Sequence, residues 1–219
     1  TFQSLFYSYL CPMRVSLQNI GKKFGREWIF RGVDHVFEAG KPTVILGANG
    51  SGKSTLLQVI AGSLIPGEGK TEYVSEGTTV PQEEIYRHVS IASPYLDLVD
   101  DFTLHESISF HRQFKNFRNG MKEKDLLEIS GLTASKDKQL KNFSSGMKMR
   151  VRLLLAILSD TSLLLLDEPC SNLDRQGCEW YAQLVTGNLA DRCVIVCSNQ
   201  VKEEHFFCTE EIRMEAFHQ

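Results

Sequence analysis

The chain has 219 residues, of which 42% are hydrophobic and 23% charged, so it is long and apolar enough for one sizeable core and is not predicted to be disordered. A formal net charge of −3 excludes a general electrostatic attraction to nucleic acid or anionic lipid, and no nucleic-acid partner is predicted. No apolar run approaches the roughly 18 residues that span a bilayer, so any membrane role requires another chain.

The first twelve residues carry no charge and are rich in Phe and Tyr. They lack the basic start and small-residue cleavage site of a secretory signal. We therefore expect residues 1–12 to be an extension ahead of a domain that begins at Met13.

Three short strands are expected next, at residues 14–20, 33–37 and 43–46. The third, Thr43-Val44-Ile45-Leu46, leads into the segment G-A-N-G-S-G-K-S-T, which fits the phosphate-binding pattern G-x-x-x-x-G-K-[ST]. A helix over residues 54–61, closed by Gly62, is predicted to follow. A strand before the pattern and a helix after it are the context in which it binds phosphate, which disfavours an ordinary glycine-rich turn.

The chemistry of this segment comes from its backbone and two side chains. Glycines let successive N–H groups point inward at phosphate oxygens, and the helix adds its positive N-terminal end. Lys53 would reach the β- and γ-phosphates, and Ser54 would place its hydroxyl on Mg²⁺. The candidate nucleotide-binding residues are Gly47, Ala48, Asn49, Gly50, Ser51, Gly52, Lys53, Ser54 and Thr55.

The middle of the chain is predicted to be mostly helical. A turn is expected at residues 66–69 and a strand at 89–92. From about 101 to 141, the apolar spacing indicates two or three helices, with Gly120 and Gly131 as breaks.

A second nucleotide-related element is the run Leu163-Leu164-Leu165-Leu166-Asp167-Glu168. Four consecutive apolar residues are typical of a fully buried parallel strand. Because ligands of α/β sheets sit at the carboxyl ends of the strands, the two acids should emerge beside the bound phosphates. Asp167 would hold Mg²⁺ and Glu168 would polarise the attacking water, although the pair could instead merely cap the next helix.

The six cysteines include no C-x-x-C pair. Reduced thiols are therefore predicted, several of them in the core, rather than a metal site or a disulfide framework.

Between the two elements lies Phe143-Ser144-Ser145-Gly146-Met147, at the predicted start of a helix over residues 147–158. With the phosphate-binding segment and the acidic strand, it resembles the ABC-type ATPase domain, whose L-S-G-G-Q signature opens a helix some twenty residues before the acidic strand. Ser144 and Gly146 match that signature, whereas Phe143, Ser145 and Met147 depart from it. The resemblance implies that Ser144, Ser145, Gly146 and Met147 act on the ATP of an opposite subunit.

The resemblance extends from about residue 15 to about residue 200. It implies that Ser171, Asn172, Leu173 and Asp174 form the D-loop, which crosses the dimer interface. Phe24 resembles the aromatic side chain that stacks on adenine, and Trp28 is the competing candidate.

Two departures from the family pattern concern the mechanism. Asn199 takes the place of the usual His that touches the γ-phosphate. Its amide can donate a hydrogen bond but cannot carry a proton, so we predict that ATP binding is retained and hydrolysis is slower. The Gln expected after the strand at 89–92 is also missing; Ser93 stands there, and metal coordination would rest mainly on Ser54 and Asp167.

The resemblance implies an α/β fold, that of a P-loop NTPase of the ABC ATPase type. A RecA-like core would join an N-terminal antiparallel β part and an inserted helical subdomain. Residues 13–92 and 147–219 would form the nucleotide-binding core of one domain, and residues from about 95 to 146 the helical subdomain with the signature.

The implied function is that of an ATP-binding and ATP-hydrolysing subunit, with Mg²⁺, that powers an ABC transporter through ATP-driven dimer closure. Its expected partners are a second ATPase subunit, in a homodimer or a heterodimer, and a separate transmembrane permease. It would lie on the cytoplasmic face of the membrane. Two alternatives are a non-transport ATPase of a cytosolic complex and a degenerate ATP-binding subunit of a heterodimer.

By the same analogy, a permease would dock on the segment from Tyr95 to Ser107. Tyr95, Leu96, Leu98 and Phe102 would supply apolar contacts.

Overall fold

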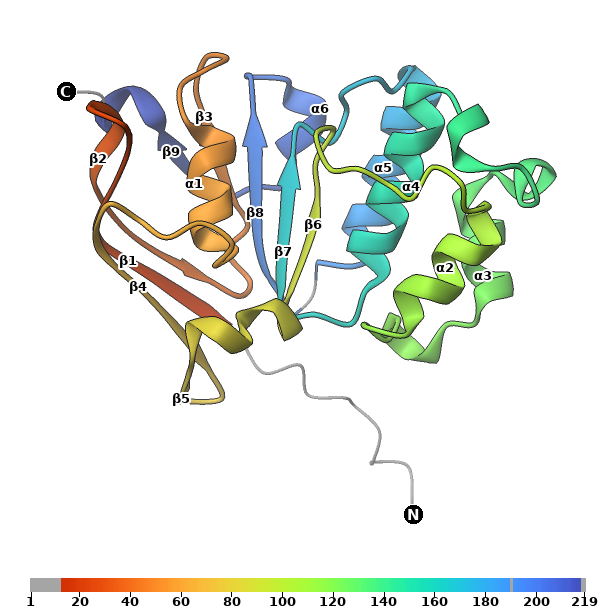
Figure 1. Ribbon diagram of the computed structural model, residues 1–219, viewed down its shortest axis with the longest axis horizontal. Helices are drawn as coiled ribbons and strands as arrows, with labels where there is room; N and C mark the ends of the chain where they lie inside the picture. Colours follow the sequence, from red (N-terminus) through yellow and green to blue (C-terminus); the bar gives the residue numbers. More distant parts are fainter. Residues whose placement is uncertain (1–12, 190, 218–219) are drawn as a thin grey trace.

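The computed structural model describes residues 13–189 and 191–217, and the predicted extension at 1–12 lies outside them. Two β-sheets and a set of helices make up this part of the chain (Figure 1). One sheet is antiparallel and the other is parallel, as the sequence predicted.

The strands of the antiparallel sheet come from the N-terminal part of the chain, between residues 14 and 80. β1 pairs with β2 on one side, where Val15 lies opposite Phe37, and with β4 on the other, where Val15 lies opposite Tyr73. Its strands in spatial order are β2 (Glu27–Glu38), β1 (Arg14–Phe24), β4 (Glu68–Ser75) and β5 (Thr78–Val80).

The central sheet is parallel, and the candidate phosphate- and metal-binding residues lie at or after the carboxyl ends of its strands. The run Leu163–Asp167 lies between two other strands of the sheet, which explains why it is apolar on both faces. The strands in spatial order are β6 (Val89–Ala92), β7 (Leu163–Asp167), β8 (Cys193–Ser198), β3 (Thr43–Leu46) and β9 (Glu210–Arg213).

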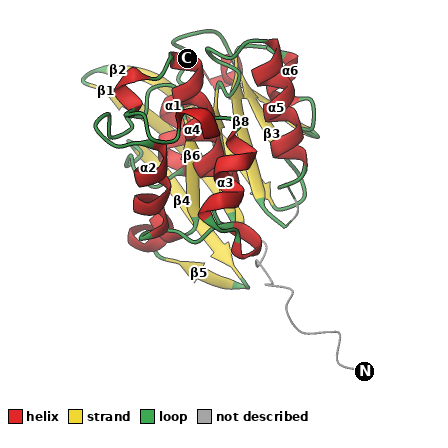
Figure 2. Cartoon of the chain, turned by 90° about the vertical axis from the view of Figure 1, so that its right-hand side faces the viewer, coloured by secondary structure: helices red, strands yellow, loops and turns green. Residues whose placement is uncertain are grey.

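The helices lie on both faces of the central sheet (Figure 1). They are α1 (Lys53–Ile60), α2 (Leu104–Arg112), α3 (Glu123–Ser130), α4 (Ser145–Leu158), α5 (Arg175–Thr186) and α6 (Lys202–His205). Seen from the side, α2 and α3 stand in front of α4, against which both pack (Figure 2). None of the helices in the described ranges is long and apolar enough to cross a membrane.

Two apolar cores meet at the central sheet, because successive side chains of a strand point to opposite faces. One core contains the side chains of α4 and α5 together with Val44, Leu46, Leu164, Leu166, Val194 and Val196. The other contains those of α1 and the antiparallel sheet together with Ile45, Leu163, Leu165, Cys193, Ile195 and Cys197.

Several predicted elements differ from the observed ones at their ends. β1 and β2 are longer than expected and form one hairpin through Gly25 and Arg26. The signature helix begins at Ser145 and not at Met147, because Ser144 caps it. The expected turn at residues 66–69 overlaps the start of β4, which opens at Glu68.

Candidate nucleotide-binding and hydrolysis site

The phosphate-binding segment leaves β3 and enters α1, as predicted. Its tight course depends on Gly52, the residue before the helix, which adopts a left-handed φ of 87°. A Cβ at this position would lie 2.7 Å from Ile29 Cγ2, so both the backbone angle and the packing against β2 require glycine.

Lys53 is buried, with 4% of its surface exposed, and its side chain folds back over the loop. Its ammonium donates to the carbonyl oxygens of Gly47 at 2.8 Å and Ala48 at 3.0 Å, and to Oδ1 of Asn199. A positive charge held at the mouth of a loop of backbone amides is suited to a phosphate group.

Asn199 joins the phosphate-binding segment to the acidic strand. It follows β8, and while its Oδ1 accepts from Lys53, its Nδ2 donates to Oε1 of Glu168 at 2.8 Å and to Oδ1 of Asn49. Both ends of the amide are therefore matched, the oxygen to a cation and the nitrogen to a carboxylate. A cavity of about 250 Å³ opens beside this cluster, lined by Gly47, Ala48, Asn49, Asn199, Gln200 and Glu215.

Asp167 ends β7 inside the protein, with 2% of its surface exposed. Ser93, the residue after β6, donates a 3.1 Å hydrogen bond to Oδ2 of Asp167. Burial raises the pKa of Asp167, and hydrogen bonds from Ser54 and Ser93 oppose that shift. The other oxygen, Oδ1, is buried without a hydrogen-bond partner in the described part of the chain.

These donors fit Mg²⁺, which prefers oxygen ligands and keeps several waters. Oδ1 of Asp167, which has no hydrogen-bond partner among the described residues, lies beside the hydroxyls of Ser54 and Ser93, and such a set of oxygens can serve this ion. The hydroxyl of Ser93 is thus beside the metal-binding candidates, in the position where the family pattern has Gln.

Glu168 follows Asp167 with a left-handed φ of 45°, which is uncommon for a residue other than glycine. Its N–H donates to the carbonyl of Cys197 on β8 at 2.9 Å, and its own carbonyl accepts from the N–H of Ser171 at 2.9 Å. These bonds hold the strained turn, which directs the carboxylate of Glu168 toward Asn199.

The signature segment lies elsewhere, at the start of α4. Ser144 caps the helix, since its Oγ accepts from the N–H of Met147 at 3.2 Å. Gly146 lies against the next loop, and a Cβ there would stand 2.7 Å from the carbonyl oxygen of Asn172. A separate cavity of about 280 Å³ opens here, and its lining residues all come from the range 132–177.

The predicted D-loop packs against that signature segment. Asn172 has a left-handed φ of 64°, and Asp174 caps α5 by accepting from the N–H of Gly177 at 2.7 Å. Ser144, Ser145, Gly146 and Met147 share the walls of the cavity with Asn172, Leu173 and Asp174.

The two aromatic candidates for base stacking differ in exposure. Phe24 ends β1 with 54% of its surface exposed. Trp28 is half-buried, and its ring is covered by the Arg31 guanidinium at 4.7 Å and the Lys23 ammonium at 5.2 Å from the centroid. The Lys22 ammonium also lies over the Phe24 ring, 5.4 Å from its centroid, so the greater exposure of Phe24 is what makes its ring the more accessible.

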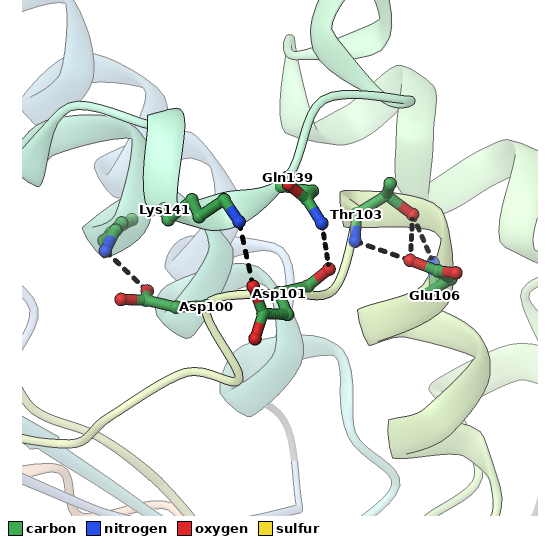
Figure 3. A network of polar contacts seen from close by, with 7 residues as sticks. Asp100, Asp101, Thr103, Glu106, Gln139 and Lys141 are labelled. Carbon is green, nitrogen blue, oxygen red and sulfur yellow. Dashed lines mark hydrogen bonds and ion pairs between the residues drawn. The ribbon is translucent and has the colours of Figure 1, made fainter.

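A polar network that the sequence did not predict connects the segment after β6 to the signature region (Figure 3). Asp100 pairs with Lys148 on α4 at 2.6 Å, and Asp101 pairs with Lys141 at 3.0 Å. The carbonyl of Asp101 also accepts from Gln139 at 3.0 Å. The sequence could not predict these ion pairs, because the partners in each pair are at least 40 residues apart and meet only in the folded chain.

The structure thus assembles Lys53, Asn199, Glu168 and Asp167 at one end of the central sheet, and it places the predicted signature and D-loop residues together around a different cavity. Comparison with known proteins identifies the family. The family model described as ABC transporter matches residues 30–171.

The chain belongs to the ABC transporter family. It is an ATP-binding cassette of that family, with the ATPase function the family carries. It is 31% identical over 193 residues to the cytochrome c biogenesis ATP-binding export protein CcmA of Mesorhizobium japonicum, a match that covers 86% of this chain and 92% of that protein.

Other ABC proteins match over different shares of their length. The ribose import ATP-binding protein RbsA of Lactococcus lactis subsp. cremoris is 28% identical over 90% of this chain, which spans only 42% of that protein. A putative ABC transporter ATP-binding protein from Pyrococcus furiosus has the same fold, with a TM-score of 0.77 and 17% identity over 94% of this chain and 100% of that one. A cassette solved as a dimer in a post-hydrolysis state with ADP and Pi superposes with a TM-score of 0.75 and 22% identity, over 91% of this chain and 93% of that one.

Proposed function

We propose that this cassette works as one half of a pair that closes on two molecules of Mg·ATP and opens after hydrolysis. The observation that carries the proposal is the separation of its two phosphate-related sites. Asn199 accepts from Lys53 and donates to Glu168, whereas the N-terminus of the signature helix opens on a cavity that none of these three residues lines. A second subunit would bring its signature over the first site, and this geometry favours such a pair.

Within one site, the side chains have separate tasks. Lys53 would exchange its present carbonyl partners for the β- and γ-phosphates, and Glu168 would accept a hydrogen bond from the attacking water. Asn199 would turn its amide donor from Glu168 to the γ-phosphate. Ser54 and Asp167 would hold Mg²⁺, which when bound neutralises charge that develops on the phosphate oxygens. Phe24 would stack on the base.

A transmembrane permease is the proposed second partner, which would place the cassette on the cytoplasmic face of the membrane. The exposed side chains of Tyr95, Leu96 and Val99 follow β6, and the rings of Phe102, Phe110 and Phe114 form a row with centroids 5.4 and 5.1 Å apart. Leu98, expected at this surface, is half-buried and packs against the core. Exposed apolar side chains gathered in this way are typical of a protein contact.

The proposed docking segment, residues 95–107, is joined to the signature helix α4 by two polar contacts. The guanidinium of Arg152 on α4 donates to the carbonyl of Leu96 at 2.6 Å, and Asp100 pairs with Lys148 at 2.6 Å. We propose that residues 95–146 form a helical subdomain with the signature, attached to a nucleotide-binding core of residues 13–92 and 147–219. A permease that moved the docking segment would then move the signature as well.

Steady-state Mg·ATP hydrolysis, measured over a range of protein concentrations, tests the pairing and the chemistry together. Glu168→Gln serves as the control for contaminating activity. We expect the specific activity to rise with protein concentration and to fall about 10²-fold or more in the variant. A wild type that binds ATP yet shows only the activity of the variant would contradict a self-sufficient homodimer and would favour a heterodimer.

A further inference from the structure

Glu204 is a buried carboxylate outside the set of residues considered so far. It lies on α6 with 3% of its surface exposed, whereas its neighbour Glu203 is exposed. Burial raises the pKa of Glu204 to about 7, and the charges of Glu168 and Asp167 act in the same direction. A carboxylate in such a place is costly unless hydrogen bonds satisfy it.

Two hydrogen bonds satisfy it, and they come from two different loops. Oε1 accepts from the backbone N–H of Cys170 at 3.2 Å, and Oε2 accepts from the hydroxyl of Ser198. The helix that carries Glu204 is itself held, because the hydroxyl of Tyr181 on α5 donates to the backbone carbonyl of Glu204 at 2.8 Å. One side chain therefore bridges the segment after β7 and the end of β8.

These two segments carry the groups proposed for hydrolysis. Cys170 follows Glu168 by two residues, and Ser198 directly precedes Asn199. Glu168 and Asn199 contact each other at 2.8 Å through their own side chains. A cavity of about 170 Å³, large enough for several waters, is bordered by both of them and by Glu204.

We propose that Glu204 is a positioning residue for hydrolysis, which fixes the distance between Glu168 and Asn199 by tying together the backbone segments that carry them. The inference rests on the proposed function of those two residues. The bridge adds to the backbone bonds that hold the left-handed turn at Glu168, since a strained turn keeps its direction only when its surroundings hold it. Small displacements of catalytic groups lower the rate of the chemical step without preventing substrate from binding.

The test compares Glu204→Ala and Glu204→Gln with the exposed control Glu203→Ala. For each purified chain, kcat and KM for Mg·ATP are measured together with backbone hydrogen exchange. Glutamine can accept from Cys170 and donate to Ser198, so it preserves the bridge, whereas alanine removes it. If Glu204→Ala does not fold, Ser198→Ala cuts one arm of the bridge with little loss of volume.

We expect Glu204→Ala to lower kcat about tenfold with KM changed less than about twofold, and Ser198→Ala to lower it about threefold. Glu204→Gln should keep at least about half of the wild-type kcat, and Glu203→Ala should match the wild type. Exchange of the Cys170 amide and of residues 198–201 should accelerate together in the alanine variant. An unchanged kcat in Glu204→Ala, or an equal loss in Glu204→Gln, would overturn the proposal.

If the proposed function is wrong, the measurements will give a different result. In that case the wild type itself would show no more turnover than Glu168→Gln. The exchange measurement would still decide whether Glu204 joins the two segments: coupled acceleration supports the bridge, and independent or unchanged exchange refutes it.

Discussion

The phosphate-binding end and the signature face of this molecule differ in how their polar groups are satisfied. At the phosphate-binding end, Asn199 pairs with Lys53, Asn49 and Glu168 within one chain. At the signature face, Ser144 caps its own helix, and the helix start opens on a cavity. The paired groups of the first site all come from one chain, whereas the second site offers an open helix start, a place that favours an anion.

The largest effect is expected from Lys53→Ala, which removes the charge at the phosphate-binding end. The variant lacks the ammonium and its hydrogen bonds to phosphate, each worth about 1.5–3 kcal/mol. ATP affinity should therefore fall at least tenfold, and turnover should vanish. Titration with ATP under equilibrium conditions gives the affinity. Because the site is built within one chain, the loss should be the same at every protein concentration; affinity equal to that of the wild type would refute the role of Lys53.

Gly146→Ala tests the opposite face. A Cβ would stand 2.7 Å from the carbonyl oxygen of Asn172, so the signature and the D-loop must separate. Turnover should fall about tenfold or more while the single chain still binds ATP. Gly187→Ala is the matched control, because its nearest neighbour would be 3.7 Å away and its φ of −71° suits alanine.

Mixing Lys53→Ala with Gly146→Ala sharpens the comparison further. Half of the random pairs would contain one intact composite site, so a 1:1 mixture should recover roughly a quarter of the wild-type activity. A mixture no more active than its components would contradict the assignment of the signature to the opposite subunit.

Asn199→His is expected to act more mildly. A histidine can carry a positive charge toward the γ-phosphate, which an amide cannot, so kcat should rise about three- to tenfold with little change in ATP affinity. Single-turnover hydrolysis separates this step from product release. No change in the rate would show that the amide of Asn199 does not limit the chemistry.

A last effect concerns stability and not turnover, and it comes from Glu204. Its pKa rises from 4.5 in the unfolded chain to about 7 in the folded protein. The folded state therefore holds its proton more tightly and loses stability relative to the unfolded state as the pH rises from about 4.5 through 7. Between pH 5 and pH 8 the wild type should lose about 2–3 kcal/mol more than Glu204→Gln, measured by urea unfolding. A constant gap between the two proteins would contradict the shifted pKa.

The sequence predicted those parts of the fold and site that local patterns encode. The phosphate-binding segment with its flanking strand and helix is contiguous, and the four leucines of β7 identify a strand buried on both faces. β4, β5 and β9 were not predicted, since their exposed and half-buried polar residues carry no clear apolar alternation.

Local sequence patterns could not predict contacts between segments that are distant in the chain. Glu204 stands in the charged run Lys202-Glu203-Glu204, which by itself indicates a solvated helix face. Its burial follows from Ser198 and Tyr181, which the fold brings to it. In the same way, the hydrogen bonds of Asn199 with Lys53, Asn49 and Glu168 form because the segments after β3, β7 and β8 meet at the carboxyl ends of these strands.

The alternation of side chains along the central strands has a mechanical consequence. Leu164 and Leu165 are neighbours in sequence, yet they belong to cores on opposite faces of the sheet. The layer that carries α4 and the signature therefore shares few interior side chains with the layer that supports α1 and the phosphate-binding segment. The sheet therefore separates the side-chain packing that supports α4 and the signature from the packing that supports α1 and the phosphate-binding segment, and only the backbone of the shared strands joins the two cores.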